Sequence, residues 1–194
     1  MATDNVTPAE TAPRSGFWLV VLGTGLCAVL LSVWIRNSLP DSHSGLPAGA
    51  VATVLKAAGW LNGETPAQTP APGTIRVMHA WFAACPACLE EAPALVKLHA
   101  EYHDQGVEFV GLTYEPPDMV SQIDEYLQAT GITWVNGYGG LETLQEFGVE
   151  YFPSIWIIDS QGQILWNRDS ELSLEEAIPL ALSGKLSQGT LIAP

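Results

Sequence analysis

The sequence predicts an α/β protein with a mixed central sheet and helices on both faces, preceded by one transmembrane helix. Three observations carry this prediction. Residues 17–35 form an apolar run without a charged side chain, long enough to span a bilayer. From residue 75 on, strand-like and helix-like patterns follow in the order β-α-β-α-β-(α)-β-β-α. Cys85 and Cys88 stand at the head of the first helix of this series.

The charge of the chain is strongly acidic and unevenly placed. The 194 residues carry a formal net charge of -14, all of which lies in residues 37–194. A domain this acidic is a poor candidate for nucleic acid or anionic lipid, so we expect no nucleic-acid partner. Three cysteines fit one redox pair better than a disulfide scaffold.

The apolar run 17–35 has the features of an uncleaved membrane anchor that follows a short N-terminal tail, 1–16. Trp18 and Trp34 stand near its ends, as interfacial anchors do. A cleaved signal peptide is the alternative, but no small-x-small cleavage pattern follows the run. Lipidation at Cys27 is disfavoured because Leu26 precedes it. The lipid bilayer is therefore an expected partner.

Flanking charge gives the anchor no orientation, since one arginine stands on each side. A tethered dithiol domain is most useful on the oxidising side of a membrane. We therefore expect a single-pass cell-membrane protein whose C-terminal domain is extracytoplasmic, in the periplasm or its equivalent.

The remainder divides into a linker, a domain and a tail. Residues 36–73 are rich in Pro, Gly and Ala and are predicted to be a spacer, with a short helix at 50–61. Residues 74–186 form the domain and 187–194 the tail. The predicted strands of the domain are 75–82, 107–114, 132–135, 154–158 and 163–167. The predicted helices are 85–103, 119–130, 141–147 and 173–183. Pro93 should kink the first helix, and a capping box at Ser173 begins the last one.

The Cys85-Pro86-Ala87-Cys88 segment has the spacing of a redox dithiol. Cys85 falls at the expected N-cap, and Pro86 suits the first helical position. Free backbone N–H groups and the helix dipole then favour a thiolate on Cys85, and the thiolate is the nucleophile. Cys88, one turn on, is close enough to form a disulfide with it.

Two other interpretations of the cysteine pair remain. A zinc site needs further ligands, and the remaining Cys27, His99 and His103 are poorly placed in the sequence. A purely structural disulfide gains little across so short a loop. No metal is expected.

Together, these segments resemble the thioredoxin fold and, within it, the membrane-anchored TlpA/ResA-like thiol-disulfide oxidoreductases. The resemblance covers residues from about 70 to 186, and the anchor and linker also fit it. It rests on the aromatic strand Ala80-Trp81-Phe82 running into the cysteines, Pro93 in the following helix, the strand Gly106–Leu112, the segment Gly148–Ser154 and the hairpin Asp159–Ile164.

The resemblance implies a site. Cys85 and Cys88 would be the catalytic pair and form the redox disulfide, without a metal or organic cofactor. Pro153 would be cis and lie beside the cysteines, with the Phe152 backbone facing an incoming substrate strand. A proline that merely begins a strand is the alternative. The expected substrate-binding residues are Trp81, Ala84, Pro86, Phe152 and Pro153.

Three positions depart from the family pattern or extend it. Ala84 stands where the family commonly has Trp, which removes a large surface beside the site. His79 stands where thioredoxins usually carry a buried Asp, and we take it as a candidate proton acceptor for Cys88 or else a buried histidine without a catalytic part. Glu115, just past the second strand, is a possible buried acid near the site or a surface loop residue.

The resemblance thus predicts reduction of protein disulfides, with electrons from a membrane thiol donor and a possible place in cytochrome c maturation. The same site run in reverse would be a disulfide donor. A peroxiredoxin is less consistent with the sequence, since the Thr expected three residues before its cysteine is Phe82. A non-enzymatic partner-binding module is the remaining alternative.

Overall fold

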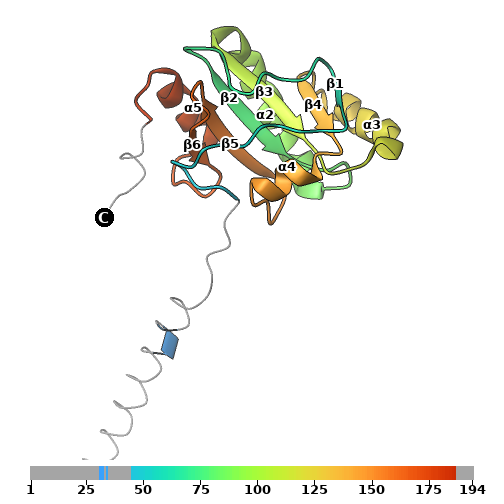
Figure 1. Ribbon diagram of the computed structural model, residues 1–194, viewed down its shortest axis with the longest axis horizontal. Coiled ribbons are helices and arrows are strands. Elements are labelled where there is room, and N and C mark those ends of the chain that lie inside the picture. Colours follow the sequence, from blue (N-terminus) through green and yellow to red (C-terminus); the bar gives the residue numbers. More distant parts are fainter. Residues whose placement is uncertain (1–30, 33, 35–44, 187–194) are drawn as a thin grey trace, which may run out of the picture. The chain divides into compact units, whose positions relative to one another are not determined.

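The computed structural model describes Leu31, Ser32, Trp34 and residues 45–186. Residues 45–186 lie within one compact unit, Ser42–Pro194. Its strands and helices are β1 (Gly59–Leu61), β2 (Ile75–Ala80), α2 (Pro86–Tyr102), β3 (Val107–Leu112), α3 (Val120–Thr130), β4 (Val135–Tyr138), α4 (Leu141–Glu146), β5 (Ser154–Asp159), β6 (Ile164–Asn167) and α5 (Leu174–Leu182) (Figure 1). From β2 on, this is the predicted order of elements.

One six-stranded sheet organises the domain, in the order β1-β4-β3-β2-β5-β6. The strands β2, β3 and β4 are parallel to one another, whereas β5, β6 and β1 each pair antiparallel with a neighbour. The predicted mixed sheet is therefore confirmed. The predicted strand at 132–135 is displaced: the chain joins the sheet only at Val135, because Ile132 and Trp134 pack into the core ahead of the pairing.

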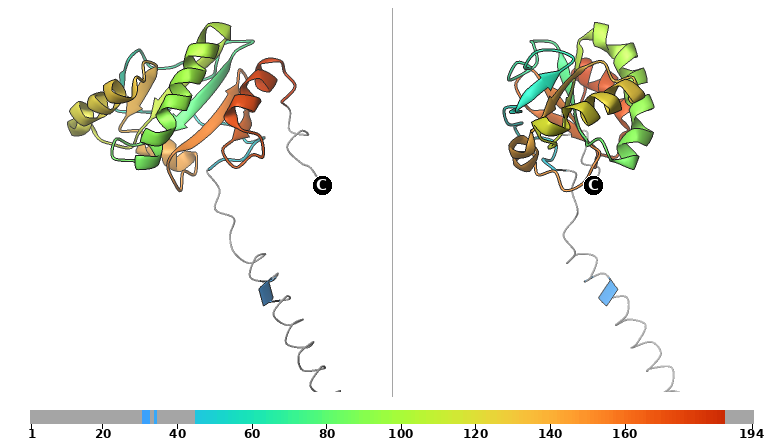
Figure 2. Two further views of the ribbon diagram at one scale, coloured as in Figure 1. Left: turned by 180° about the vertical axis from the view of Figure 1, so that it is seen from behind. Right: turned by 90° about the vertical axis from the view of Figure 1, so that its right-hand side faces the viewer.

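Three helices, α2, α3 and α5, cover one face of the sheet, as the view from behind in Figure 2 shows. The side chains of β2 alternate, so that Val77 and Trp81 face these helices. Buried residues of α2 and α5, such as Leu95 and Ile178, complete this core. The capping box at Ser173 and Glu176 starts α5 as predicted.

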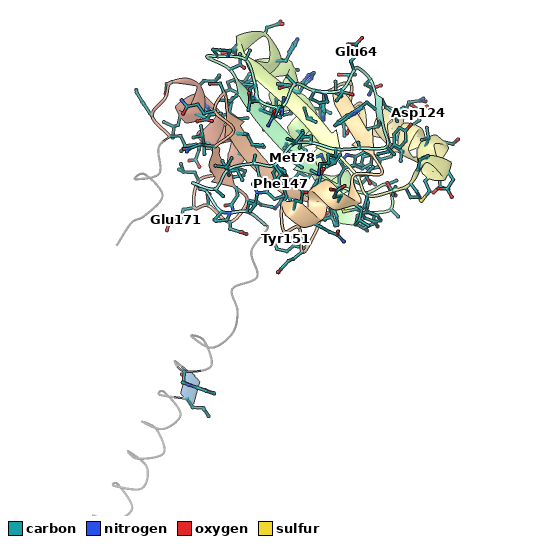
Figure 3. All side chains as sticks on the ribbon, in the orientation of Figure 1. Glu64, Met78, Asp124, Phe147, Tyr151 and Glu171 are labelled. Carbon is teal, nitrogen blue, oxygen red and sulfur yellow. A yellow bond between two sulfur atoms is a disulfide. The ribbon has the colours of Figure 1, made fainter. Side chains whose placement is uncertain are left out.

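The opposite face is covered by α4 and by the chain from Leu46 to Trp60, the strap, which crosses the sheet in front in Figure 1. Met78 and Phe147 are central to this second core and are labelled in Figure 3. The prediction of a spacer is thus wrong for residues 46–61, which pack against the sheet or pair with its edge. Their Pro- and Gly-rich composition hid a widely spaced set of apolar residues that bury against the sheet: Leu46, Leu55 and Trp60.

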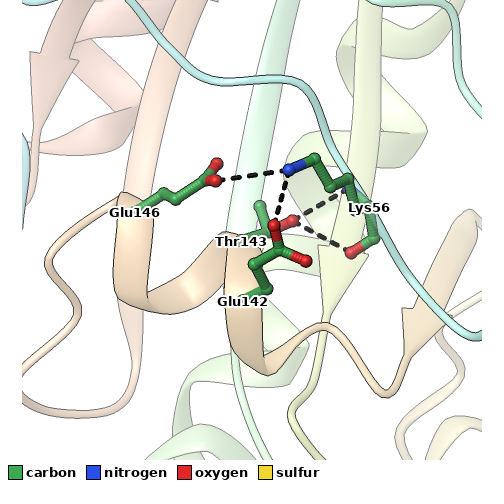
Figure 4. Close-up of polar contacts among 4 residues, drawn as sticks. All are labelled: Lys56, Glu142, Thr143 and Glu146. Atoms are coloured by element: carbon green, nitrogen blue, oxygen red, sulfur yellow. Dashed lines mark hydrogen bonds and ion pairs between the residues drawn. The ribbon is translucent and has the colours of Figure 1, made fainter.

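The strap is held by backbone and side-chain contacts rather than by a helix, so the predicted helix at 50–61 is also wrong. The buried Thr143 hydroxyl accepts from the Lys56 N–H (2.8 Å) and donates to the Lys56 carbonyl (2.9 Å). The Lys56 ammonium pairs with Glu142 (2.7 Å) and Glu146 (3.3 Å) on α4 (Figure 4). The strap ends in β1, which pairs with β4 at the sheet edge.

Nothing in the described residues tests the membrane anchor. They contain no helix that is both long and apolar enough to cross a bilayer. The predicted span 17–35 lies outside them except for Leu31, Ser32 and Trp34. The tails 1–16 and 187–194 lie outside them as well, so these assignments stay predictions.

Candidate active site

Strand pairing brings two loops together: the cysteine loop, residues 81–85 between β2 and α2, and the Pro153 loop, residues 147–153 between α4 and β5. The last residue of β2, Ala80, pairs with the first residue of β5, Ser154. Because these strands are antiparallel, the loop that follows β2 and the loop that precedes β5 lie at the same end of the sheet. The first loop leads to Cys85, and the second contains the Phe152–Pro153 peptide, which is cis as the resemblance implied.

Cys85 is the N-cap of α2, and Pro86 follows at the first helical position. The Cys88 N–H donates to the Cys85 Sγ at 3.1 Å, and the Cys85 N–H donates to the Phe82 carbonyl at 3.1 Å. The predicted local geometry is confirmed. The two cysteines form a disulfide. Cys85 keeps 3% of its surface exposed and Cys88 none, so an incoming sulfur reaches Cys85 first.

An aromatic cluster borders the disulfide. The ring of Phe82 lies 5.3 Å from that of Phe152 and 5.8 Å from that of Tyr114, and the latter two lie 5.7 Å apart, measured between centroids. Tyr114 is 39% exposed, and Phe82 and Phe152 are half-buried. Together with the exposed Ala84 and Pro86, the three rings give the site an apolar rim. No sequence pattern predicted that the rings of Phe82 and Tyr114 would lie together, because the two residues are on different loops.

Trp81 does not belong to this rim, and its predicted contact with substrate is wrong. Its side chain has no exposed surface. The indole stacks on Tyr126 of α3, with centroids 4.3 Å apart, and its Nε1–H donates to Asn136 Oδ1 at 3.0 Å. The side-chain alternation of β2 continues into Trp81 and directs its ring into the core that α2 and α3 cover.

His79 is buried in the middle of the sheet with 1% of its surface exposed. It faces the same side as Trp81, since the two are separated by one residue of β2. Neither ring nitrogen has a hydrogen-bond partner among the described residues. Burial, and then the charge of Arg168, lower the pKa of His79 to about 3. The reason for proposing it as a proton acceptor, a pKa near neutrality, is therefore absent in this disulfide state.

Glu115 is buried, with 3% of its surface exposed, and it lies against the cysteine loop. Both carboxylate oxygens accept from the Ala83 N–H at 3.1 Å, and Oε2 also accepts from the Thr113 hydroxyl at 2.9 Å. The structure thus brings this acid to the site rather than leaving it on the loop surface. It ties the end of β3 to the residue two before Cys85.

Glu91 is a charged neighbour of the site that the sequence reasoning missed. It lies one helical turn past Cys88, on the face of α2 that meets the sheet. It forms an ion pair with Arg168 of the β6–α5 loop, and its Oε2 atom is buried without a partner among the described residues. The sequence could have predicted this position, because Glu91 is three residues after Cys88 and residues three apart share a helix face.

The described residues contain no group of three or more His, Cys, Asp or Glu side chains arranged to hold a metal ion. The two histidines considered as zinc ligands stack on each other, and His99 packs against Phe109 and Trp134. The Cys85–Cys88 pair itself gives the site the chemistry of thiol-disulfide exchange.

Comparison with known proteins agrees with this chemistry. Residues 61–177, more than half of the chain, match the family model named Redoxin. The chain belongs to the redoxin family. A curated relative of this redoxin is the thiol-disulfide oxidoreductase ResA of Halalkalibacterium halodurans, 27% identical over 156 residues, which cover 78% of the chain and 85% of the relative.

Solved structures share the fold at lower identity. The thioredoxin domain of a thiol-disulfide oxidoreductase from Bacteroides vulgatus has a TM-score of 0.59 at 20% identity, covering 73% of this chain and 99% of the other. A thiol-disulfide isomerase from Corynebacterium glutamicum has a TM-score of 0.57 at 20% identity, covering 72% and 97%. The redoxin is thus a TlpA/ResA-like thiol-disulfide oxidoreductase with a thioredoxin-like fold.

Proposed function

We propose that this redoxin is a membrane-anchored, extracytoplasmic reductant of protein disulfides. The observation that carries the proposal is the unequal exposure of the two cysteines at the head of α2: Cys85 keeps 3% of its surface exposed and Cys88 none. An attacking thiol must meet its substrate, whereas a resolving thiol needs only to reach its partner.

The reaction follows from this geometry. After reduction, the Cys88 N–H that donates to the Cys85 Sγ and the dipole of α2 stabilise a thiolate on Cys85. This thiolate attacks one sulfur of a substrate disulfide, and the other substrate sulfur leaves as a thiol. Cys88 then attacks the Cys85 sulfur of the mixed disulfide. The second substrate thiol leaves, and the Cys85–Cys88 disulfide of the structure is formed. The substrate has gained two electrons.

Substrate is held between the aromatic rim and the Pro153 loop. The half-buried Phe152, before the cis peptide bond, presents its backbone to an extended polypeptide beside Cys85. The rings of Phe82 and Tyr114 cover apolar side chains of that polypeptide. Ala84 and Pro86, both exposed, complete the contact.

Each turnover leaves Cys85 and Cys88 as a disulfide, so the enzyme needs two electrons to return to the dithiol state, and a membrane thiol protein supplies them. The anchor predicted at 17–35 keeps the two proteins on one membrane. The resemblance to the TlpA/ResA-like proteins suggests cysteine pairs of apocytochrome c as the first substrate to test.

Trapping of the mixed disulfide tests the order of attack. In a Cys27→Ala background, which leaves only the pair of interest, Cys88→Ser should accumulate a covalent complex with a disulfide-containing substrate protein on a non-reducing gel. Cys85→Ser should accumulate none. Equal trapping by both variants, or trapping only by Cys85→Ser, contradicts the assignment.

Protease protection of the domain in right-side-out vesicles would contradict the extracytoplasmic orientation.

A further inference from the structure

A cavity of about 300 Å³ opens beside the cysteine loop, on the side that faces α3. It is lined by Ala83 and Ala84 of the cysteine loop, by Glu115, and by residues of α3 that include Glu125 and Tyr126. The small side chains of the two alanines leave this space open. Ala84 directly precedes Cys85, so the lining of the cavity reaches the residue before the cysteine that meets the substrate.

The polar groups of this cavity are incompletely paired. The buried Glu115 carboxylate has two hydrogen-bond donors, the Ala83 N–H and the Thr113 hydroxyl. Within the described part of the chain, no Lys, Arg or His forms an ion pair with Glu115 or with Glu125. A buried carboxylate without a cation is costly unless a charged partner arrives.

Tyr126 adds an independent observation. The residue is 6% exposed, and its hydroxyl is buried without a hydrogen-bond partner among the described residues. Burial, followed by the charges of Glu91 and Glu115, raises the pKa of Tyr126 to about 12. The hydroxyl therefore stays protonated, and its oxygen is available to accept a hydrogen bond. A buried hydroxyl without a partner and a buried carboxylate without a cation, on two residues that line the same cavity, point to a ligand that supplies N–H donors and positive charge.

We propose that this cavity binds the side chain of an arginine or lysine next to the reacting cysteine of the substrate. Glu115, Glu125 and Tyr126 are then specificity-determining residues. The inference rests on the proposed reduction of polypeptide disulfides by Cys85, and it names the substrate class: cysteines flanked by a basic residue.

Reach and charge both fit this occupant. An extended chain advances about 3.3 Å per residue, so a substrate bound through its sulfur to Cys85 places its neighbouring side chains at the mouth of the cavity. Arginine fits best, because its planar guanidinium has five N–H donors that match carboxylates. The charge of -14 also attracts basic polypeptides from a distance.

The test uses the full chain, reduced, in detergent micelles, with two chromogenic peptides. Each peptide carries one cysteine joined by a disulfide to thionitrobenzoate, and the residue beside that cysteine is arginine in one and its neutral isostere citrulline in the other. The Cys85 thiolate attacks the peptide sulfur and releases thionitrobenzoate, whose absorbance gives a second-order rate constant. We expect the arginine peptide to react about tenfold faster, the size of effect that a charge-assisted pair provides.

Two variants of the same helix locate the effect. Glu125→Gln should lower the ratio of the two rate constants to about threefold, since one charged contact is lost. Asp124→Asn is the matched control: Asp124, labelled in Figure 3, is on α3 but not in the cavity, so the ratio should stay near tenfold. Ala84→Trp, which fills the entrance, should bring the ratio close to one even if Glu125→Gln folds poorly.

Each other result has a definite meaning. If neither peptide releases thionitrobenzoate, the proposed function fails. If both react at the same rate, the enzyme is a reductase and the cavity does not select basic side chains. An equal fall of the ratio in Glu125→Gln and Asp124→Asn would mean that only the overall charge acts, which also overturns the inference.

Discussion

The buried His79 should make the stability of the domain depend on pH in a way that a single substitution removes. Its ring lies in β2 beside Gly111 of β3 and Ile155 of β5, its register partners. In the unfolded chain its pKa returns to the ordinary value of 6.5, against about 3 in the folded domain. Between these values the unfolded chain binds a proton at this position that the folded chain does not bind.

The sign and size follow from linkage. The stability contributed by the neutral ring is fully present above the unfolded pKa of 6.5 and is lost as the pH falls toward the folded pKa of about 3. Each pH unit within this window costs about 1.4 kcal/mol. Between pH 7 and pH 4, one such histidine therefore lowers the free energy of unfolding by about 3 kcal/mol.

Urea unfolding of residues 42–194 at pH 7, 5.5 and 4, followed by tryptophan fluorescence, measures this contribution. The variant His79→Leu should lose about 3 kcal/mol less than the native sequence over this range, whatever its stability at pH 7. The control Ile155→Val, at the position paired with His79, should be about 1 kcal/mol less stable at each pH and keep the native pH dependence. Parallel curves for His79→Leu and the native sequence would refute the reasoning.

Three further predictions concern the strap, the packing of the sheet and the aromatic rim. Thr143→Val leaves the Lys56 N–H and carbonyl without their partner and should lower the free energy of unfolding by about 1–3 kcal/mol. The control Lys56→Ala removes only exposed ion pairs and should change the urea midpoint little. Equal effects of the two variants would mean that the Thr143 hydroxyl does not hold the strap in place. Gly111→Ala would place a Cβ 1.7 Å from the Asn136 Oδ1 atom and should cost more than about 2 kcal/mol, so a native thermal midpoint would contradict the close packing of the sheet. Tyr114→Ala should slow reduction of a protein disulfide several-fold while leaving the reaction with hydroxyethyl disulfide near its native rate, because only the larger substrate reaches the rim; equal slowing of both would argue against a docking role.

The domain fold was predictable because its signals are local. Cys85, Pro86 and the apolar run before them define a strand that leads into a capped helix, and both elements form where expected. Ser173 and Glu176 specify the start of α5 in the same way.

The strap was missed because its signal is not local. Leu46, Leu55 and Trp60 bury against the sheet at separations that match neither a helix nor a strand. Its hydrogen bonds are made to distant residues, as between Lys56 and Thr143. Such contacts are set by tertiary packing, which no local pattern records.

Only the part of the site that depends on local sequence signals was predictable. The two cysteines and the cis peptide at Pro153 belong to contiguous motifs. The aromatic rim, the link between Glu115 and Ala83 and the depression of the pKa of His79 depend on which strands become neighbours. Trp81 was misplaced because an aromatic residue near a site has the same sequence signature whether it faces the core or the substrate.

The reduction potential of the Cys85–Cys88 couple tests the central claim most directly. The full chain is equilibrated with defined ratios of reduced and oxidised dithiothreitol or glutathione, and the fraction of free thiol is measured by alkylation in a Cys27→Ala background. A reductant should give a value near or below about -220 mV, within the range of thioredoxins and glutaredoxins. A value near about -120 mV, typical of a strong oxidant, would contradict the account and make this redoxin a donor of disulfides.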